Sequence, residues 1–181
     1  MSTATVAAFP RMSEQPGRAV GAREAEFRAF YADSYRDVAG YCWNLVRDDD
    51  LAHELAQEAF TRLYGRWIGI REPRAYVFHV ASNLVKNAWR ERRDARETVA
   101  ALATRRETHD RTTEDQAARV GVRDAILALP DRYREIVLLF YYADLTVPDV
   151  AKAVGRPAGS VKRMLNEARA LLAKSLGDAH A

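Results

Sequence analysis

The stretch TVPDVAKAVGRPAGSVKRMLNEARALL, residues 146–172, decides the fold of the C-terminal part of the chain. Thr146 followed by Asp149 approximates a capping box and predicts a short helix over 147–154. Three turn-forming residues come next and predict a tight turn: Gly155, Pro157 and Gly159. Beyond the turn, apolar side chains recur at the spacing of one helix face: Val161, Leu165, Ala168 and Leu172. The stretch therefore predicts two helices that meet at a sharp turn.

This pair of helices has the order of a helix-turn-helix unit, whose second helix fits the major groove of DNA. Lys162 and Arg163 lie near the start of the second helix, on its predicted outer side, where they can reach guanine edges or phosphates. The candidate DNA-facing residues of the turn and the helix start are Arg156, Gly159, Ser160, Lys162, Arg163 and Asn166. Two helices that pack together without contacting DNA remain the alternative.

The composition limits the size and the class of the protein. With 181 residues, 48% of them apolar, the chain can bury one moderate core or two small ones. The formal net charge is only +3, but the charges are grouped: residues 33–58 carry seven acidic and two basic side chains, whereas residues 62–97 carry nine basic and four acidic ones. Cys42 is the single cysteine, so an intramolecular disulfide is excluded, and we predict a small buried apolar residue there.

The apolar spacing is helical throughout, so we predict an all-α fold of two small helical domains joined by a flexible linker. The linker sequence is polar and charged, with a short helix expected near Val99–Leu102. A linker of about 24 residues spans roughly 25–30 Å when relaxed and roughly 80 Å when extended, so it does not fix the separation of the domains. The predicted parts are a disordered leader (1–22), a first domain (23–94), the linker (95–117), a second domain (118–177) and a tail (178–181).

An acidic face is predicted on the helix LAHELAQEAFTRL, residues 51–63. Its apolar residues form one face, and four polar residues at helical spacing form another: Glu54, Gln57, Glu58 and Thr61. On spacing alone, the polar face is either a solvated surface or a docking surface for a basic partner.

A basic face is predicted on the helix that follows Pro73, after a loop marked by Gly65 and Gly69. Amide and cationic side chains alternate on it: His79, Asn83, Lys86, Asn87 and Arg90. Asparagine reads base edges and cations hold phosphates, while Trp67 in the loop could stack on an unpaired base, a contact worth about 1–3 kcal/mol. The alternatives are a core position for Trp67 and a solvated basic stripe on the helix.

No constellation for catalysis or metal binding is found in the sequence. The segment HELAQE lacks the second histidine of a zinc-protease helix, and the four histidines have no metal-ligand spacing. We therefore expect no enzyme, no cofactor and no metal site. No stretch reaches the roughly 18 apolar residues of a membrane span, and the N-terminal residues lack a secretory pattern, so we expect a cytoplasmic protein without membrane insertion.

Three segments together resemble a known family. AHELAQEAFTRLY (52–64) and PRAYVFHVASNLVKNAWRERRD (73–94) are similar to region 2 of the extracytoplasmic-function sigma factors of the sigma-70 family. The segment 128–172, which ends in the stretch quoted above, resembles region 4 of the same family. The resemblance covers roughly Glu24 to Gly177, with the segments in the family's order around a polar linker. It implies a subunit that recruits core RNA polymerase to promoters and performs no catalysis itself.

The resemblance also implies roles for individual residues. Region 2 would contact the polymerase β′ clamp through Glu54, Leu55, Gln57 and Glu58. The promoter −10 element would be melted and bound by Trp67, His79, Asn83, Lys86, Asn87, Arg90 and Arg93, with Asn83 receiving a flipped base. Region 4 would bind the β flap and read the −35 element through the six DNA-facing residues named above. Promoter DNA and core polymerase are the implied partners, and an anti-sigma factor is a further candidate.

The chain departs from the family pattern at four positions that bear on these roles. Glu167 and Met164 replace cations near DNA, His53 replaces an acid in the polymerase-facing helix, and Tyr76 replaces a tryptophan. We expect Glu167 to face phosphate, with acceptance of a hydrogen bond from cytosine as the alternative. A stand-alone helix-turn-helix regulator remains the second functional hypothesis, and a protein-interaction adaptor the third.

Overall fold

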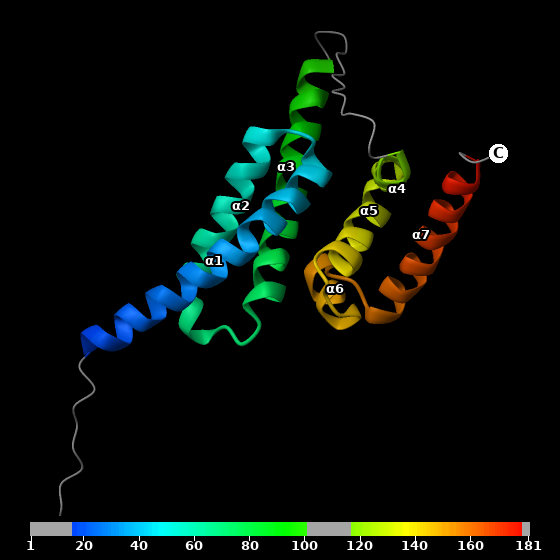
Figure 1. Ribbon diagram of the computed structural model, residues 1–181. Helices are drawn as coiled ribbons and strands as arrows, with labels where there is room; N and C mark the ends of the chain where they lie inside the picture. The colour runs from blue at the N-terminus through cyan, green and yellow to red at the C-terminus, as the bar shows by residue number, and fades with distance from the viewer. Residues whose placement is uncertain (1–15, 101–116, 179–181) are drawn as a thin grey trace, which may run out of the picture.

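The computed structural model describes residues 16–100 and 117–178, and Figure 1 shows them as two groups of helices. The first bundle contains α1 (Pro16–Val46), α2 (Asp49–Tyr64), the 3-10 turn η1 (Trp67–Gly69) and α3 (Pro73–Ala100). The second bundle contains α4 (Ala117–Ala128), α5 (Asp131–Val137), the π-helical turn η2 (Leu138–Tyr142), α6 (Val147–Val154) and α7 (Ala158–Asp178). The described residues form no strand, so the predicted all-α fold is confirmed.

The acidic helix α2 is defined by local signals at both ends. The Asp48 side chain accepts a hydrogen bond of 3.0 Å from the backbone N–H of Leu51, which caps the first turn. Acidic residues occupy the first turn and Arg62 the last, so the charge at each end of the helix interacts favourably with the helix dipole. The buried face of α2 consists of Ala52, Leu55, Ala56, Ala59, Phe60 and Leu63.

The two-helix unit predicted from residues 146–172 is confirmed as α6 and α7. Thr146 caps α6 by accepting a hydrogen bond from the backbone N–H of Asp149 at 3.4 Å. Gly155 ends α6 in the left-handed conformation, with φ of 67°, which a residue with a Cβ rarely adopts. The following N–H, of Arg156, then bonds to the Ala151 carbonyl at 3.0 Å, so the chain turns sharply into α7.

The two bundles pack against each other through α3, which lies beside α6 and α5 (Figure 1). One continuous group of buried apolar residues runs from Tyr41 and Phe78 in the first bundle to Leu139 and Val150 in the second. Arg74 on α3 adds a polar link, because it donates to Asp37 of α1 and to the Ala143 carbonyl after η2, both at 2.9 Å. The linker length does not fix the separation of the domains, but in the structure the two bundles share one hydrophobic core.

The helix boundaries differ from the prediction at two places. α1 begins at Pro16, inside the predicted leader, because Pro16 suits a first helical turn and the arginine, alanine and glutamate residues that follow favour helix. α3 continues to Ala100, inside the predicted linker, because no glycine or proline interrupts residues 94–100. The rest of the predicted leader and linker, and the tail after residue 178, lie outside the described residues. None of the described helices is long and apolar enough to cross a membrane.

Candidate polymerase and nucleic-acid interfaces

The polar face of α2 is exposed, as its spacing predicts. Glu54 and Gln57 are exposed, and Glu58 is half-buried in an ion pair with Arg62, with Oε1 and Nε 2.7 Å apart. Leu55 differs from these three residues, because only 8% of it is exposed and it belongs to the core. The structure therefore brings Glu54, Gln57 and Glu58 onto one surface and gives Leu55 a packing role beneath it.

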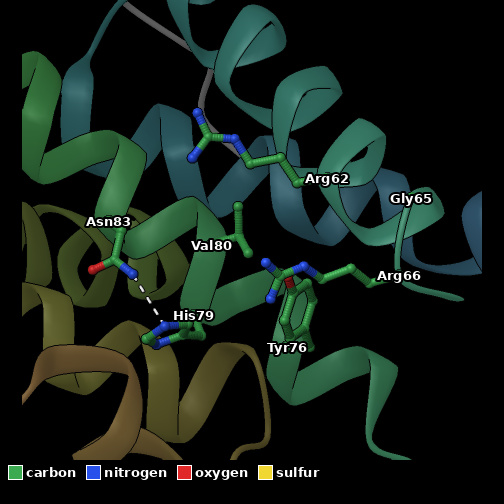
Figure 2. Close-up of a pocket in the computed structure, with 7 residues that line it drawn as sticks. All are labelled: Arg62, Gly65, Arg66, Tyr76, His79, Val80 and Asn83. Atoms are coloured by element: carbon green, nitrogen blue, oxygen red, sulfur yellow. Dashed lines mark hydrogen bonds between the residues drawn. The ribbon is translucent and has the colours of Figure 1, made fainter. Parts of the chain in front are cut away.

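A cavity of about 430 Å³ opens between the end of α2 and the first turns of α3 (Figure 2). Its lining combines two arginines, a tyrosine, a histidine and an amide: Arg62, Gly65, Arg66, Tyr76, His79, Val80 and Asn83. The Asn83 amide nitrogen lies within hydrogen-bond distance of Nε2 of His79, at 3.1 Å, and Oδ1 stays available to a ligand. The volume lies within the roughly 300–1,000 Å³ of typical small-ligand pockets.

Trp67 lies outside this cavity. Its ring packs at right angles to Phe27, with centroids 5.2 Å apart, and against Phe30 at 5.5 Å. It lines a second cavity, formed by residues 64–70, which shares Gly65 and Arg66 with the first. The structure thus puts Tyr76, rather than Trp67, beside Asn83, and the sequence pattern contained the signal: Tyr76, His79 and Asn83 follow one helix face.

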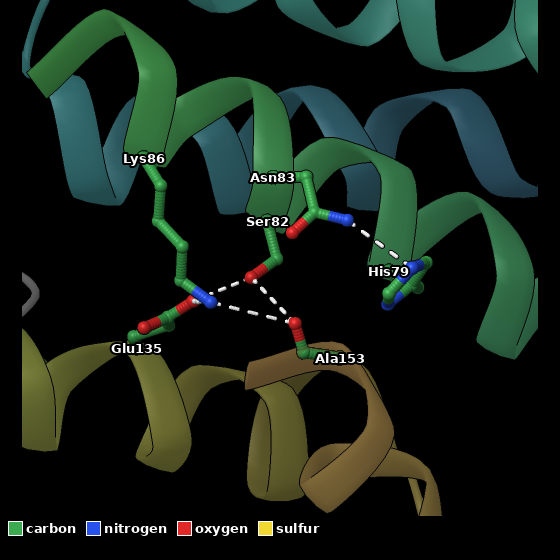
Figure 3. Close-up of polar contacts among 6 residues, drawn as sticks. All are labelled: His79, Ser82, Asn83, Lys86, Glu135 and Ala153. Carbon is green, nitrogen blue, oxygen red and sulfur yellow. Dashed lines mark hydrogen bonds and ion pairs between the residues drawn. The ribbon is translucent and has the colours of Figure 1, made fainter. Parts of the chain in front are cut away.

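The remaining cationic and amide residues of α3 separate into two groups. Asn87, Arg90 and Arg93 are exposed, and Arg90 donates to the Asn87 side-chain oxygen at 3.3 Å. Lys86 instead turns toward the second bundle, where Nζ lies 3.1 Å from Oε1 of Glu135 and 3.4 Å from the Ala153 carbonyl oxygen (Figure 3). The predicted basic face of α3 is therefore interrupted at Lys86.

The predicted outer face of α7 is exposed. All six candidate residues of the turn and helix start are on the surface, while Val161, Leu165 and Ala168 are buried. Asn166 accepts a hydrogen bond of 3.1 Å from Arg169, which in turn donates to the Tyr141 hydroxyl at 2.6 Å. Met164 is half-buried and packs against the core, so its replacement of a cation does not leave an apolar side chain free on this face.

Glu167 does not stand free to meet DNA, which corrects our expectation that it faces phosphate. One carboxylate oxygen accepts from Nε of Arg163 at 2.9 Å, and the other accepts from the Tyr133 hydroxyl at 2.9 Å. Both hydrogen bonds lower the pKa of Glu167 below its ordinary value, and the bond from Tyr133 has the larger effect. The carboxylate therefore holds Arg163, one of the candidate DNA-facing cations.

The described residues contain no cluster of three or more His, Cys, Asp or Glu side chains that could hold a metal ion. Cys42 is fully buried in the first bundle, and burial raises the pKa of its thiol to about 12. A thiol with this pKa stays protonated at neutral pH and is a poor nucleophile.

Two family models match the chain, one for each bundle. The model for sigma-70 region 2 matches residues 30–95, and the model for sigma-70 region 4 matches residues 119–172. The RNA polymerase sigma-E factor of Streptomyces antibioticus is 34% identical over 135 residues, which covers 73% of this chain and 74% of that protein. The ECF RNA polymerase sigma factor SigW of Bacillus subtilis is 26% identical over 165 residues, covering 81% of this chain and 87% of that protein.

Solved structures share the fold. RpoE of Bartonella quintana, in complex with the anti-sigma factor NepR, superposes with a TM-score of 0.69 at 17% identity, covering 84% of this chain and 97% of that one. CnrH, in complex with the cytosolic domain of CnrY, gives a TM-score of 0.61 at 20% identity, covering 91% and 96% of the two chains. The sequence matches and the shared fold, with both sigma regions in order, lead to one conclusion: this chain belongs to the extracytoplasmic-function sigma factors of the sigma-70 family.

Proposed function

We propose a division of labour among three surfaces of this sigma factor, which binds core RNA polymerase and directs transcription initiation from specific promoters. The acidic face of α2 docks on the β′ clamp, the cavity beside Asn83 receives an unpaired base of the −10 element, and the start of α7 reads the −35 element. The observation that carries the proposal is the cavity of Figure 2, which combines an aromatic ring, an amide and two guanidinium groups.

The chemistry of the cavity suits an extruded base. Flipping a base costs a few kcal/mol of stacking, which the site must return through stacking and hydrogen bonds. Tyr76 offers a ring face, and Asn83 offers an acceptor oxygen because its amide nitrogen is engaged by His79. Arg62 and Arg66 line the same cavity and supply positive charge for the adjoining phosphates. Trp67 keeps a supporting role in this proposal, since its packing against Phe27 and Phe30 orders the loop at the cavity rim.

The other two surfaces differ in charge, which supports different partners. Glu54, Gln57 and Glu58 present an acidic and amide surface suited to a basic groove on a protein. The start of α7 presents exposed cations, Lys162 and Arg163, suited to the major groove of duplex DNA. The second bundle would also contact the β flap. We assign the first sigma domain to residues 23–94 and the second to residues 118–177.

Anti-sigma factors are a further class of partner in this proposal. The solved relatives RpoE and CnrH are complexes with NepR and with the cytosolic domain of CnrY. We propose that the protein acts in the cytoplasm with the polymerase and contributes binding surfaces, while the core enzyme performs the chemistry. A stand-alone helix-turn-helix regulator is not favoured, because it would need only the second bundle, whereas the first matches sigma region 2.

Run-off transcription with core RNA polymerase on a randomised promoter library tests the proposal. We expect the protein to select templates with two conserved elements separated by a constant spacer, and selection to require the core enzyme. Transcription without template selection, or selective binding to one element by the protein alone with no transcription, would contradict it.

A further inference from the structure

A tyrosine of the π-helical turn η2 supports the exposed face of α7. The ring of Tyr141 lies at right angles to that of Phe140, with centroids 4.9 Å apart, and Phe140 packs against the hydrophobic core. The Tyr141 side chain is nevertheless exposed, and its hydroxyl accepts a hydrogen bond of 2.6 Å from Nε of Arg169 on α7. The Arg169 guanidinium carbon lies 5.8 Å from the centre of the same ring. The turn therefore anchors this guanidinium to the body of the second bundle.

Arg169 in turn orients Asn166. Its Nη1 donates to Oδ1 of Asn166 at 3.1 Å, and the spacing of three residues puts both side chains on one side of α7. A guanidinium group donates hydrogen bonds and never accepts them, so the amide atom that faces it must be the oxygen. Because Arg169 is itself held by Tyr141, the orientation of the Asn166 amide is fixed from the turn η2.

The fixed orientation makes Asn166 a hydrogen-bond donor toward a ligand. Its Nδ2 carries two hydrogens and bonds to no other residue in the part of the chain that the structure describes. Arg169 has further N–H groups beyond those that bond to Tyr141 and Asn166. Lys162, four residues before Asn166, is also exposed and adds positive charge. The surface around Asn166 thus offers donors and cations, while its amide oxygen is already bonded to Arg169.

This pattern of donors distinguishes between the purines in the major groove. Guanine presents two acceptors there, N7 and O6, whereas adenine presents the acceptor N7 and the donor N6. An unrestrained asparagine commonly binds adenine through both of its amide atoms. Asn166 could do so only by turning its oxygen away from Arg169, and the positive charge of Arg169 disfavours an amino group beside it. The structure therefore favours guanine over adenine at the base that Asn166 reaches.

We infer that Tyr141 and Arg169 are positioning residues that set a base preference of the −35 element, because they hold Asn166 as a donor that selects guanine. The inference rests on the proposed function for the placement of α7 in the major groove. Neither Tyr141 nor Arg169 is among the six DNA-facing candidates of the sequence, since their roles act through Asn166 and depend on a contact between residues 28 positions apart.

Transcription by the full-length protein with core RNA polymerase tests the inference. The templates carry the −10 element and spacer selected in the run-off experiment above and a randomised −35 element, and the transcribed templates are sequenced. We expect guanine to exceed adenine about tenfold at one −35 position, and Asn166→Ala to abolish the preference at that position alone. A preference for adenine there would overturn the inference. Unchanged preferences at every position in Asn166→Ala would refute base reading by Asn166 in the proposed function and, with it, the inference.

Arg169→Met removes every donor of the guanidinium and frees the Asn166 amide to turn. The preference at the same position should then shift toward adenine about tenfold. Lys174→Met is the matched control, because it removes one exposed cation from the same helix and changes the net charge equally. We expect no shift in the control. Weaker transcription from all templates in Arg169→Met, with the preference for guanine unchanged, would identify Arg169 as a phosphate contact and overturn the inference.

Tyr141→Phe separates the role of the tyrosine from that of the arginine. The substitution keeps the ring beside Phe140 but removes the acceptor for Nε of Arg169, so the preference for guanine should fall about threefold. Tyr142→Phe is the matched control, because its hydroxyl faces Gly40 of α1 instead of α7. Circular dichroism checks that all variants keep their helices. An unchanged preference in both Arg169→Met and Tyr141→Phe, with the preference lost in Asn166→Ala, would overturn the inference and leave the proposed function intact.

Discussion

Replacing Glu167 with glutamine should strengthen binding to the −35 element by releasing Arg163. In the structure, the Arg163 guanidinium donates to Glu167 at 2.9 Å although 82% of the arginine side chain is exposed. The pair directs the Arg163 cation toward Glu167, one helical turn further along the face that we assign to DNA. Glu167→Gln removes the negative charge but keeps an oxygen for the Tyr133 hydroxyl, which lies 2.9 Å from the carboxylate. The substitution therefore adds one available cation without a large change in packing.

The size of the effect follows from the number of phosphates neutralised. One further phosphate contact makes the slope of log K against log salt concentration steeper by about 0.9. Between 50 and 200 mM salt, the affinity of Glu167→Gln should therefore fall by about 3.5-fold more than that of the unsubstituted protein. Because the contact is with phosphate, the gain at low salt should be similar on matched and scrambled −35 sequences.

Fluorescence anisotropy with short duplexes measures these affinities at four salt concentrations. Tyr133→Phe is the matched control, because it removes the other hydrogen bond to Glu167 and leaves the pair with Arg163 intact. We expect its salt slope to match that of the unsubstituted protein. Equal slopes for Glu167→Gln and Tyr133→Phe would refute the reasoning, since Arg163 would then gain no phosphate on release.

Three further predictions concern the other surfaces and the stability. Gln57→Ala combined with Glu58→Lys should weaken association with core polymerase about tenfold, as measured by co-purification, and leave the circular dichroism spectrum unchanged. Undiminished association would exclude this face of α2 as the polymerase-binding surface. Asn83→Ala should reduce open-complex formation about tenfold on duplex promoters and much less on templates mismatched over the −10 element; equal defects on both templates would argue against base flipping. The pKa of Glu167 in the folded protein lies below its ordinary value of 4.5, so its stabilising effect is present above that pH and is lost as the pH falls through the lowered pKa. In chemical denaturation, the unfolding free energy of the unsubstituted protein should therefore fall more between about pH 6 and pH 3 than that of Glu167→Gln. Identical pH profiles for the two proteins would contradict the assignment.

The parts of the fold that depend on neighbouring residues were predictable from the sequence. The cap at Thr146 and the turn at Gly155 are local, so α6 and α7 follow from a few adjacent side chains. The exposed face of α7 follows in the same way from helical spacing. The start of α1 at Pro16 and the unbroken run of α3 to Ala100 differ from the prediction, because a polar composition indicates leader or linker while the same residues also favour helix.

The candidate site depends more on contacts between distant residues. Asn83 and His79 could be grouped by spacing, but the arginines that share their cavity come from the end of α2 and the following loop. Lys86 and Glu135 are 49 residues apart, and no local pattern relates them. Glu167 and Arg163 lie four residues apart, a spacing that predicts an ion pair on a helix, whereas the resemblance to a family with a cation at position 167 predicts a contact with DNA.

The contact between the bundles has a consequence for the substitutions that it tolerates. Small and polar groups lie in it beside the apolar residues that join the two bundles. The contact includes such groups: Gly40 faces the Tyr142 hydroxyl, Ser82 donates to Glu135, and the backbone carbonyls of Ala143 and Ala153 accept from arginine, serine and lysine. A Cβ at Gly40 would lie 2.4 Å from the Tyr142 hydroxyl oxygen, so any larger residue there would require the Tyr142 side chain or the two helices to move, and the close approach limits variation at this position.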